Sequence, residues 1–346
     1  MSHDLDSSTG KPAMAYVAEA PWHGLREKLP PDRSIDDWVR AARLDWKIQM
    51  LPVRYHFEGR ERVMPERFVL TRDDTGTALS VVSADYRVVQ PSEVLEFYRE
   101  LVKDRHYTLE TAGALDGGRK VWALARTGLV AHVAGNEADE LGAYVLLATS
   151  CDKSIATTAT FTSIRVVCQN TLGFAFDDMK TRQRRHIKVD HTRKFDAACV
   201  KDSLGLIDKA WTDFMSRVNP MAVFGLSEEA AQNYFESIFV GDDDARAGKS
   251  SSNAKSREIN QIISLYRSAK GQDLATAKGT LWGALNAVTH YTDHIRSSRS
   301  GERIDSAWFG SSANLKETAW QRASDLIEMI TFPVRGPQPT TTRETQ

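Results

Sequence analysis

Apolar and polar positions change their period several times along the chain, and each change marks a predicted element. Ile35, Trp38 and Ala42 share one face of a helical projection just after Ser34. Ser34 is a typical N-cap residue, and Asp37 stands three positions later, as in a capping box. We therefore predict a helix that begins after Ser34.

From Trp46 onward, apolar residues recur at about every second position, which is the period of strands. Residues 46–57 and 67–83 follow this alternation, and Asp74-Thr75-Gly76 predicts a hairpin turn inside the second stretch. Residues 93–104 then return to helical spacing. This part of the chain is therefore predicted as strands followed by a helix.

A second round of strands follows that helix. Residues 108–126 predict a hairpin about Asp116-Gly117-Gly118. Residues 143–150 and 156–167 predict a strand pair across the short polar segment between them. Strands and a helix thus alternate with mainly antiparallel pairing, which favours an α+β fold over a doubly wound parallel sheet.

Polar side chains follow the last of these strands abruptly. We interpret Asn170 or Thr171 as the N-cap of another helix that begins with Leu172, because a side-chain oxygen there can accept a backbone N–H. Cys168 fits a small buried group at the strand end. Arg165 stands within the apolar strand, so its cation must find either a protein partner or a ligand phosphate.

The remaining chain reads mostly as helices, one of them capped by Ser227. The predicted fold class is α+β, with an antiparallel strand-hairpin/helix core and a mostly helical C-terminal region. We divide the chain into an N-terminal arm (1–33), an α+β core domain (34–194), a helical region (195–330) and a disordered tail (331–346).

Composition narrows the class of protein. The chain has 346 residues, a net charge of -1 and 41% hydrophobic residues, which are ordinary values for a globular protein. No apolar run approaches the roughly 18 residues of a membrane span, so we expect no membrane partner. Cys151, Cys168 and Cys199 form no CxxC pair, which favours free thiols and a cytoplasmic location.

A basic run, Thr181 to Lys194, is the strongest electrostatic feature. Its alternation predicts a strand or β-ribbon with cations along one edge. Such a run attracts phosphates, although a solvated edge strand also uses Lys and Arg to block aggregation. Together with Arg165, the predicted nucleic-acid-binding residues are Arg182, Arg184, Arg185, Lys188, Arg193 and Lys194.

Aromatic residues beside cations give a second hint. They occur at Tyr86-Arg87, Arg54-Tyr55-His56-Phe57, Lys120-Val121-Trp122 and Tyr266-Arg267. Bases can stack on such rings if the rings are exposed on a sheet or in a groove. The alternative is that these rings belong to the core, which is where most large aromatic side chains lie.

A different class of site is possible around the polar residues. His290 and His294 share a helical face, and Cys168 and Asn170 follow a strand, so an enzyme or small-ligand site near these four residues is one alternative. No HExxH motif surrounds the histidines and no third metal ligand is evident. We therefore predict no catalytic residue, no metal and no cofactor.

Several segments, taken in order, carry a resemblance to a known family. They are PWHGL, SIDDW, YRVVQPSEVLEF, VWALAR, RVVCQNTL, GTLWGALNAVTHYTDH and SAWFGSSANLK. Over about residues 12 to 330 the chain resembles the phage/plasmid-like proteins grouped as domain of unknown function 932. The resemblance implies a cytoplasmic protein carried by plasmids, phages or integrative elements. A weaker, fold-level likeness is to Rad52-like single-strand annealing proteins.

These observations lead to one hypothesis and two alternatives. The hypothesis is a non-enzymatic protein of a mobile genetic element that binds and anneals single-stranded DNA as a homo-oligomer. The first alternative is the enzyme or small-ligand protein described above. The second is a host-interaction or plasmid-maintenance protein.

Overall fold

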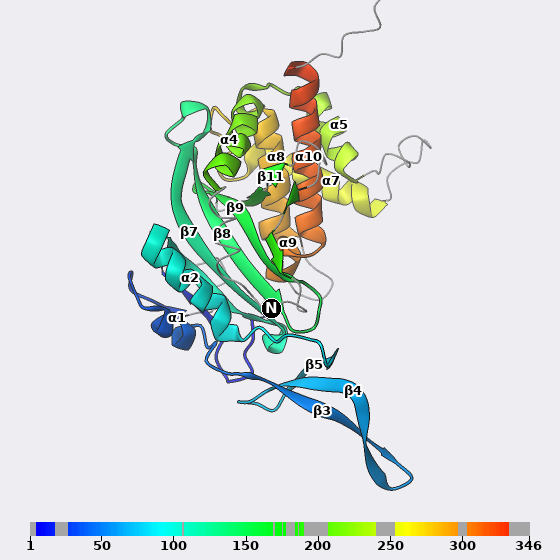
Figure 1. Cartoon of the computed structure of the whole chain (residues 1–346). Coiled ribbons are helices and arrows are strands. Elements are labelled where there is room, and N and C mark those ends of the chain that lie inside the picture. The colour runs from blue at the N-terminus through cyan, green and yellow to red at the C-terminus, as the bar shows by residue number, and fades with distance from the viewer. Residues whose placement is uncertain are drawn as a thin grey trace, which may run out of the picture.

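The computed structural model describes residues 5–17, 27–105, 107–168, 170–174, 176–177, 184–185, 187–189, 207–239, 253–296 and 303–331. A long curved sheet forms its centre, and C-terminal helices pack beside it (Figure 1). A β-hairpin arm projects away from this body. The predicted α+β class is confirmed, including the antiparallel hairpins and the mostly helical C-terminal region.

The main sheet has the strand order β10-β9-β8-β7-β6-β1-β2, and β13 also pairs with β9. Its strands are β1 (Met14–Tyr16), β2 (Glu27–Lys28), β6 (Thr108–Leu115), β7 (Lys120–His132), β8 (Glu140–Ser150), β9 (Thr157–Arg165), β10 (Asn170–Phe174) and β13 (Ile187–Val189). All these pairs are antiparallel except β1 with β2. The hairpin about Asp116-Gly117-Gly118 and the strand pair β8–β9 are as the sequence predicts.

The prediction of a helix that begins with Leu172 is wrong, because residues 170–174 form a strand. Residues 166–168 form a turn, and β10 then runs back along β9 with Asn170 opposite Arg165. The edge of β9 offers backbone hydrogen bonds to all of residues 170–174. A helix cap at Asn170 or Thr171 would satisfy fewer backbone groups of this segment. The Asn170 side chain instead donates to the carbonyl oxygen of Asn286 at 3.1 Å.

The helices follow the predicted pattern elsewhere. They are α1 (Ile35–Ala41), α2 (Pro91–Arg105), α4 (Ile207–Val223), α5 (Glu228–Phe239), α7 (Asn253–Ser268), α8 (Leu281–His290), α9 (Arg303–Trp308) and α10 (Ser311–Thr331), and a π-helical turn, η3 (Tyr291–Ile295), continues α8. Ser34 and Asp37 form the expected capping box. The Ser227 hydroxyl accepts from the Ala230 backbone N–H at 3.1 Å, as a cap does. No helix in the described ranges is both long and apolar enough to cross a membrane.

The two faces of the sheet contribute to separate cores because successive side chains along a strand point to opposite faces. Val145, Leu147 and Phe161 belong to the large cluster, which also contains side chains from α1, α2, α4 and α8. Trp122 and Leu146 belong to a smaller cluster that packs against Trp308 and Phe309 at the end of α9. One face of β9 therefore meets the helical layer, and the other faces the smaller cluster.

The projecting arm is a three-stranded sheet. Its strands are β3 (Ile48–Phe57), β4 (Arg60–Arg72) and β5 (Ala78–Ser83). The predicted turn at Asp74-Thr75-Gly76 joins β4 to β5. At the root of the arm, buried Arg72 forms ion pairs with Asp6 and Asp74 and lies over the Trp46 ring. These contacts tie the root to the body, while residues 54–67 are exposed.

Candidate nucleic-acid interface

The tip of the arm carries two exposed aromatic rings on one face. Tyr55 and Phe57 are two positions apart in β3, so they point to the same side, and 46% of Tyr55 and 52% of Phe57 is exposed. The strand register places Arg62 opposite Tyr55 and Arg60 opposite Phe57. Side chains opposite each other in an antiparallel pair share a face. This face, which we call the tip face, therefore presents two rings and two guanidinium groups.

The turn at the tip accounts for this register. Glu58 and Gly59 both have positive φ, 49° and 73° respectively. A two-residue loop with positive φ at both positions matches the right-handed twist of a hairpin. The loop therefore places Phe57 directly opposite Arg60.

The charges on the two faces of the arm differ. Arg62 lies over the Phe57 ring, with its guanidinium carbon 5.2 Å from the ring centroid. On the other face, Arg54 forms an ion pair of 2.9 Å with Glu61. Within the described part of the chain, no carboxylate lies within ion-pair distance of Arg60 or Arg62. The cations of the tip face are therefore available to an anion.

Part of the basic run forms strands, as its alternation predicts. Arg184 and Arg185 make up β12, which pairs with β11 (Phe176–Asp177). Lys188 is the middle residue of β13 and stands opposite Thr158 of β9. The backbone of β13 therefore places Lys188 at the edge of the main sheet, whereas β11 and β12 form a separate two-stranded sheet. The remaining predicted cations, Arg182, Arg193 and Lys194, lie outside the described residues.

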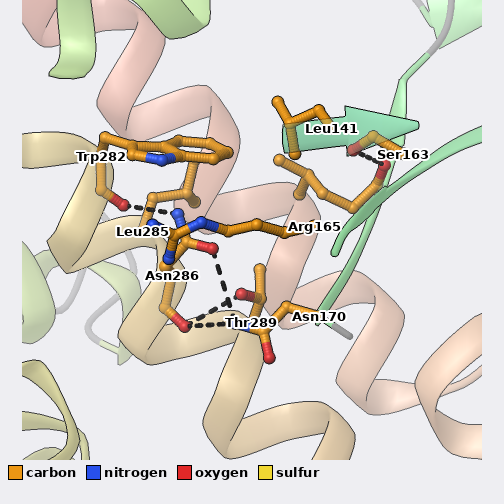
Figure 2. A pocket seen from close by; sticks show the side chains of 9 residues that line it. Leu141, Ser163, Arg165, Asn170, Trp282, Leu285, Asn286 and Thr289 are labelled. Atoms are coloured by element: carbon orange, nitrogen blue, oxygen red, sulfur yellow. Dashed lines mark hydrogen bonds between the residues drawn. The ribbon is translucent and has the colours of Figure 1, made fainter. Parts of the chain in front are cut away.

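Arg165 has a protein partner rather than an open surface. It is 1% exposed and points from β9 toward α8, beside Trp282 (Figure 2). Its Nε and Nη2 atoms donate to the two carboxylate oxygens of Asp139 at 2.6 and 2.7 Å. Nη2 also donates to the carbonyl oxygen of Gly271 at 3.2 Å. Of the two outcomes that the sequence left open, the structure gives the buried ion pair, so we leave Arg165 out of the interface.

Polar atoms continue around this ion pair. Asp139 also accepts from the Thr276 hydroxyl and from the Trp282 indole N–H. A small cavity lies beside the ion pair, and its lining includes Arg165, Asn170 and Trp282. It leaves about 10 Å³ for the centre of a water molecule. That is the space of about one water molecule, too little for a substrate. The region around Arg165 is therefore a structural network between the sheet and α8.

The structure brings together three of the four residues of the alternative small-ligand site. The Asn170 Oδ1 and His294 Nε2 atoms are 3.2 Å apart, and the His290 and His294 rings are 4.7 Å apart. Burial, and then the nearby His294, lower the pKa of His290 to about 4, so this ring is neutral at pH 7. In the described residues, no group of three or more His, Cys, Asp and Glu side chains is placed to hold a metal ion.

The two described cysteines are buried, as expected. Cys151 is 6% exposed and Cys168 is 5% exposed. Burial raises the pKa of the Cys151 thiol to about 12, and burial also raises the pKa of the Cys168 thiol. The thiolate is the nucleophilic form, so neither thiol is prepared for nucleophilic attack at neutral pH.

The other aromatic candidates differ from the tip of the arm. Trp122 is 1% exposed, and Tyr86 is also buried, so the core interpretation is confirmed for these two. Tyr266 is half-buried, and its hydroxyl donates to the carbonyl oxygen of Thr280 at 3.3 Å. Of the segments that pair aromatic residues with cations, residues 54–57 thus present the most exposed rings.

Sequence reasoning found Tyr55 and Phe57 but missed Arg60 and Arg62. Alternation alone does not tell a projecting arm from a sheet that is covered on one face. The signal that was available is Gly59, because glycine is typical of the second position of a two-residue hairpin loop. That turn would have placed the two arginines opposite the two rings.

A family model described as a domain of unknown function, DUF932, matches residues 78–308, about two thirds of the chain. The chain belongs to this family. The DUF932 match includes the strands that hold Arg165 and Asn170 as well as α8, whereas the tip of the arm precedes it. No curated protein and no solved structure matches the chain.

Proposed function

We propose that this DUF932 protein binds single-stranded DNA and anneals complementary strands, as a homo-oligomer in the cytoplasm of a cell that hosts a mobile genetic element. The observation that carries the proposal is the tip face, where exposed Tyr55 and Phe57 stand opposite Arg62 and Arg60. Rings stack on unpaired bases of any sequence, and guanidinium groups hold phosphates. The combination suits a flexible single strand.

A second source of cations supports the same proposal. The backbone of β13 carries Lys188 at the edge of the main sheet, and β12 carries Arg184 and Arg185 in a separate two-stranded sheet with β11. A strand at a sheet edge is open to a partner along one side. Cations at this edge and in the small sheet would neutralise phosphates of a bound strand, so that binding would weaken as salt rises.

Binding is tested by fluorescence anisotropy with a labelled oligodeoxythymidylate over a series of salt concentrations. For single strands the slope of log K against log salt is about −0.7 per phosphate contact. The double variant Arg60→Ala, Arg62→Ala should therefore reduce the slope by about 1.4 if each arginine holds one phosphate. The double variant Tyr55→Ser, Phe57→Ser should weaken binding about 10-fold or more without changing the slope, since stacking is worth about 1–3 kcal/mol per base.

A matched control lies on the opposite face of the same hairpin. The double variant Arg54→Ala, Glu61→Ala removes an exposed ion pair and leaves the net charge unchanged. It should leave both affinity and salt slope as they are. Absence of salt-dependent binding by the wild-type protein, or equal effects of the tip-face and control variants, would refute the proposal.

Annealing and assembly need their own assays. The rate of pairing of two complementary labelled oligonucleotides should rise in the presence of the protein, and the tip-face variants should abolish that rise. Light scattering coupled to size-exclusion chromatography should give a mass that is a multiple of the 38.7 kDa chain. The enzyme or small-ligand alternative and the host-interaction or plasmid-maintenance alternative stay predictions.

A further inference from the structure

A groove of about 440 Å³ lies on the face of β9 that is turned away from the large core. One wall is formed by Thr158, Thr160 and Thr162, which are every second residue of β9 and so share a face. The opposite wall includes Trp308 and Phe309 at the end of α9, and Lys316 of α10. The volume falls within the range of roughly 300–1,000 Å³ that ligand sites occupy.

The aromatic wall is held in place from behind. The Trp308 ring packs edge-on against buried Trp122, with centroids 4.9 Å apart and planes at 84°. Phe309 meets Trp308 at 6.2 Å, again at 84°. Trp38, Trp46, Trp122, Trp211, Trp282 and Trp320 are all buried, so Trp308 is the one described tryptophan with an appreciable exposed surface. An aromatic surface that is both fixed and accessible is suited to stacking.

The polar groups of the groove suit the edges of bases. The Thr158 and Thr162 hydroxyls donate to the carbonyl oxygens of Ala156 and Ser163, at 2.8 and 3.5 Å, so each oxygen meets a base as an acceptor. Lys316 is 5% exposed and donates to the Thr171 hydroxyl at 2.8 Å and to Asp293 at 2.7 Å. An ammonium group has three N–H donors, and the third has no partner among the described residues. Asp293 balances its charge, so Lys316 offers the groove a donor rather than a net positive charge.

Two neighbouring features connect the groove with the proposed interface. Thr158, which lines the groove, stands opposite Lys188 of the basic run in the β9–β13 register. The second feature is the root of the arm, where the Ser80 hydroxyl of β5 donates to the carbonyl oxygen of Cys151. Cys151 begins the turn whose residues 154–156 line the groove. The groove thus lies beside the basic edge and next to the segment that holds the root of the arm.

We propose that this groove is a second contact for the same single strand, in which unpaired bases stack on Trp308 and Phe309 and meet the threonine row of β9. The inference rests on the proposed function and adds where the bases go. Bases inside a duplex are already stacked and cannot reach the two rings unless they are flipped out. The groove therefore selects single strands over duplex.

Tryptophan fluorescence tests the groove separately from binding as such, because a stacked base quenches indole emission. Oligodeoxythymidylate is added to the full chain in a Trp22→Phe background, which removes a tryptophan outside the described residues. Emission should fall as the oligonucleotide binds. The further change Trp308→Phe should remove most of that fall, whereas the matched change Trp211→Phe, at a buried ring, should leave it. Trp308→Ala should also weaken binding about 10-fold.

Anisotropy on the same samples separates the two possible failures. If the oligonucleotide binds but Trp308→Phe and Trp211→Phe lose the same quenching, the groove assignment is overturned and the tip face remains as the contact. If no oligonucleotide binds, the proposed function falls and the groove assignment falls with it. Should Trp308→Phe fail to fold, an oligonucleotide with 5-iodouracil is photocrosslinked to the wild-type protein. Crosslinked peptides that contain residues 308–317 support the groove, and crosslinks confined to other segments overturn it.

Discussion

Replacing Asp139 by Asn is expected to lower the free energy of unfolding by about 3–5 kcal/mol, the cost of leaving a buried charge without its partner. Asp139 is 0% exposed and holds the Arg165 guanidinium through bonds of 2.6 and 2.7 Å. Asparagine keeps the shape of the side chain but lacks its charge, and one of its two terminal atoms becomes a donor that faces Arg165. The guanidinium then stays buried without a counter-charge.

The individual bonds lead to a similar magnitude. Hydrogen bonds to charged groups contribute about 1.5–3 kcal/mol each, and the substitution removes at least one of the two and weakens the other. Thr276 and Trp282 also donate to the Asp139 carboxylate, so the substitution weakens these two hydrogen bonds as well. A loss of several kcal/mol is large against the roughly 5–15 kcal/mol that keeps a typical protein folded.

Urea unfolding followed by near-UV circular dichroism measures this loss. The matched control is Glu61→Gln, which breaks the exposed pair with Arg54 and should change the free energy of unfolding by about 0.5 kcal/mol or less. A change below about 1 kcal/mol for Asp139→Asn would refute the reasoning. The double variant Asp139→Leu, Arg165→Met should recover part of the loss, because apolar replacement of a buried pair is often tolerated.

Further expectations concern thiols, packing and pH. Cys151 and Cys168 should react slowly with an aromatic disulfide reagent in the folded protein at pH 8, because burial raises the pKa of both thiols. Both should react quickly in urea, and equal rates in the folded and unfolded protein would contradict their burial. Gly283→Ala should destabilise the fold by about 3 kcal/mol or more in urea, since a Cβ there lies 1.9 Å from the Ala277 carbonyl oxygen. The pKa of His290 is lowered to about 4, so stability should fall as the pH drops below about 6.5 and level off near pH 4. His290→Gln should remove that part of the slope of urea midpoint against pH.

Much of the fold could be predicted from local pattern, because hairpins and helix starts depend on nearby residues. The turn at Asp74-Thr75-Gly76, the turn at Asp116-Gly117-Gly118 and the capping box at Ser34 are examples. Residues 170–174 show where this reasoning ends. This short segment forms a strand rather than a helix because β9 supplies a free strand edge for it to pair with. The local sequence does not reveal that edge.

The candidate site was less predictable because exposure is a property of the whole fold. Tyr55 and Trp122 both stand beside cations in strand-like segments, yet 46% of Tyr55 is exposed and only 1% of Trp122. Partners distant in sequence were equally hidden. Asp139 precedes Arg165 by 26 residues, and Lys316 follows Thr171 by 145. Sequence reasoning could state that Arg165 needed a partner but could not identify it.

Two buried ion pairs lie where the sheet meets the helices, and their further hydrogen bonds link the two layers and fix the geometry on which the groove depends. Asp139, just before β8, holds Arg165 of β9 and accepts from Trp282 of α8. Lys316 of α10 pairs with Asp293 of η3 and donates to the Thr171 hydroxyl of β10. A charged pair tolerates little sliding, since any shift leaves charges desolvated and unpaired, whereas apolar side chains repack at lower cost. The helix that carries Lys316 is therefore held at a set position against β9 and β10. The width of the groove between the threonine row and the aromatic wall follows from that position, so Lys316→Met should loosen the groove even where the protein stays folded.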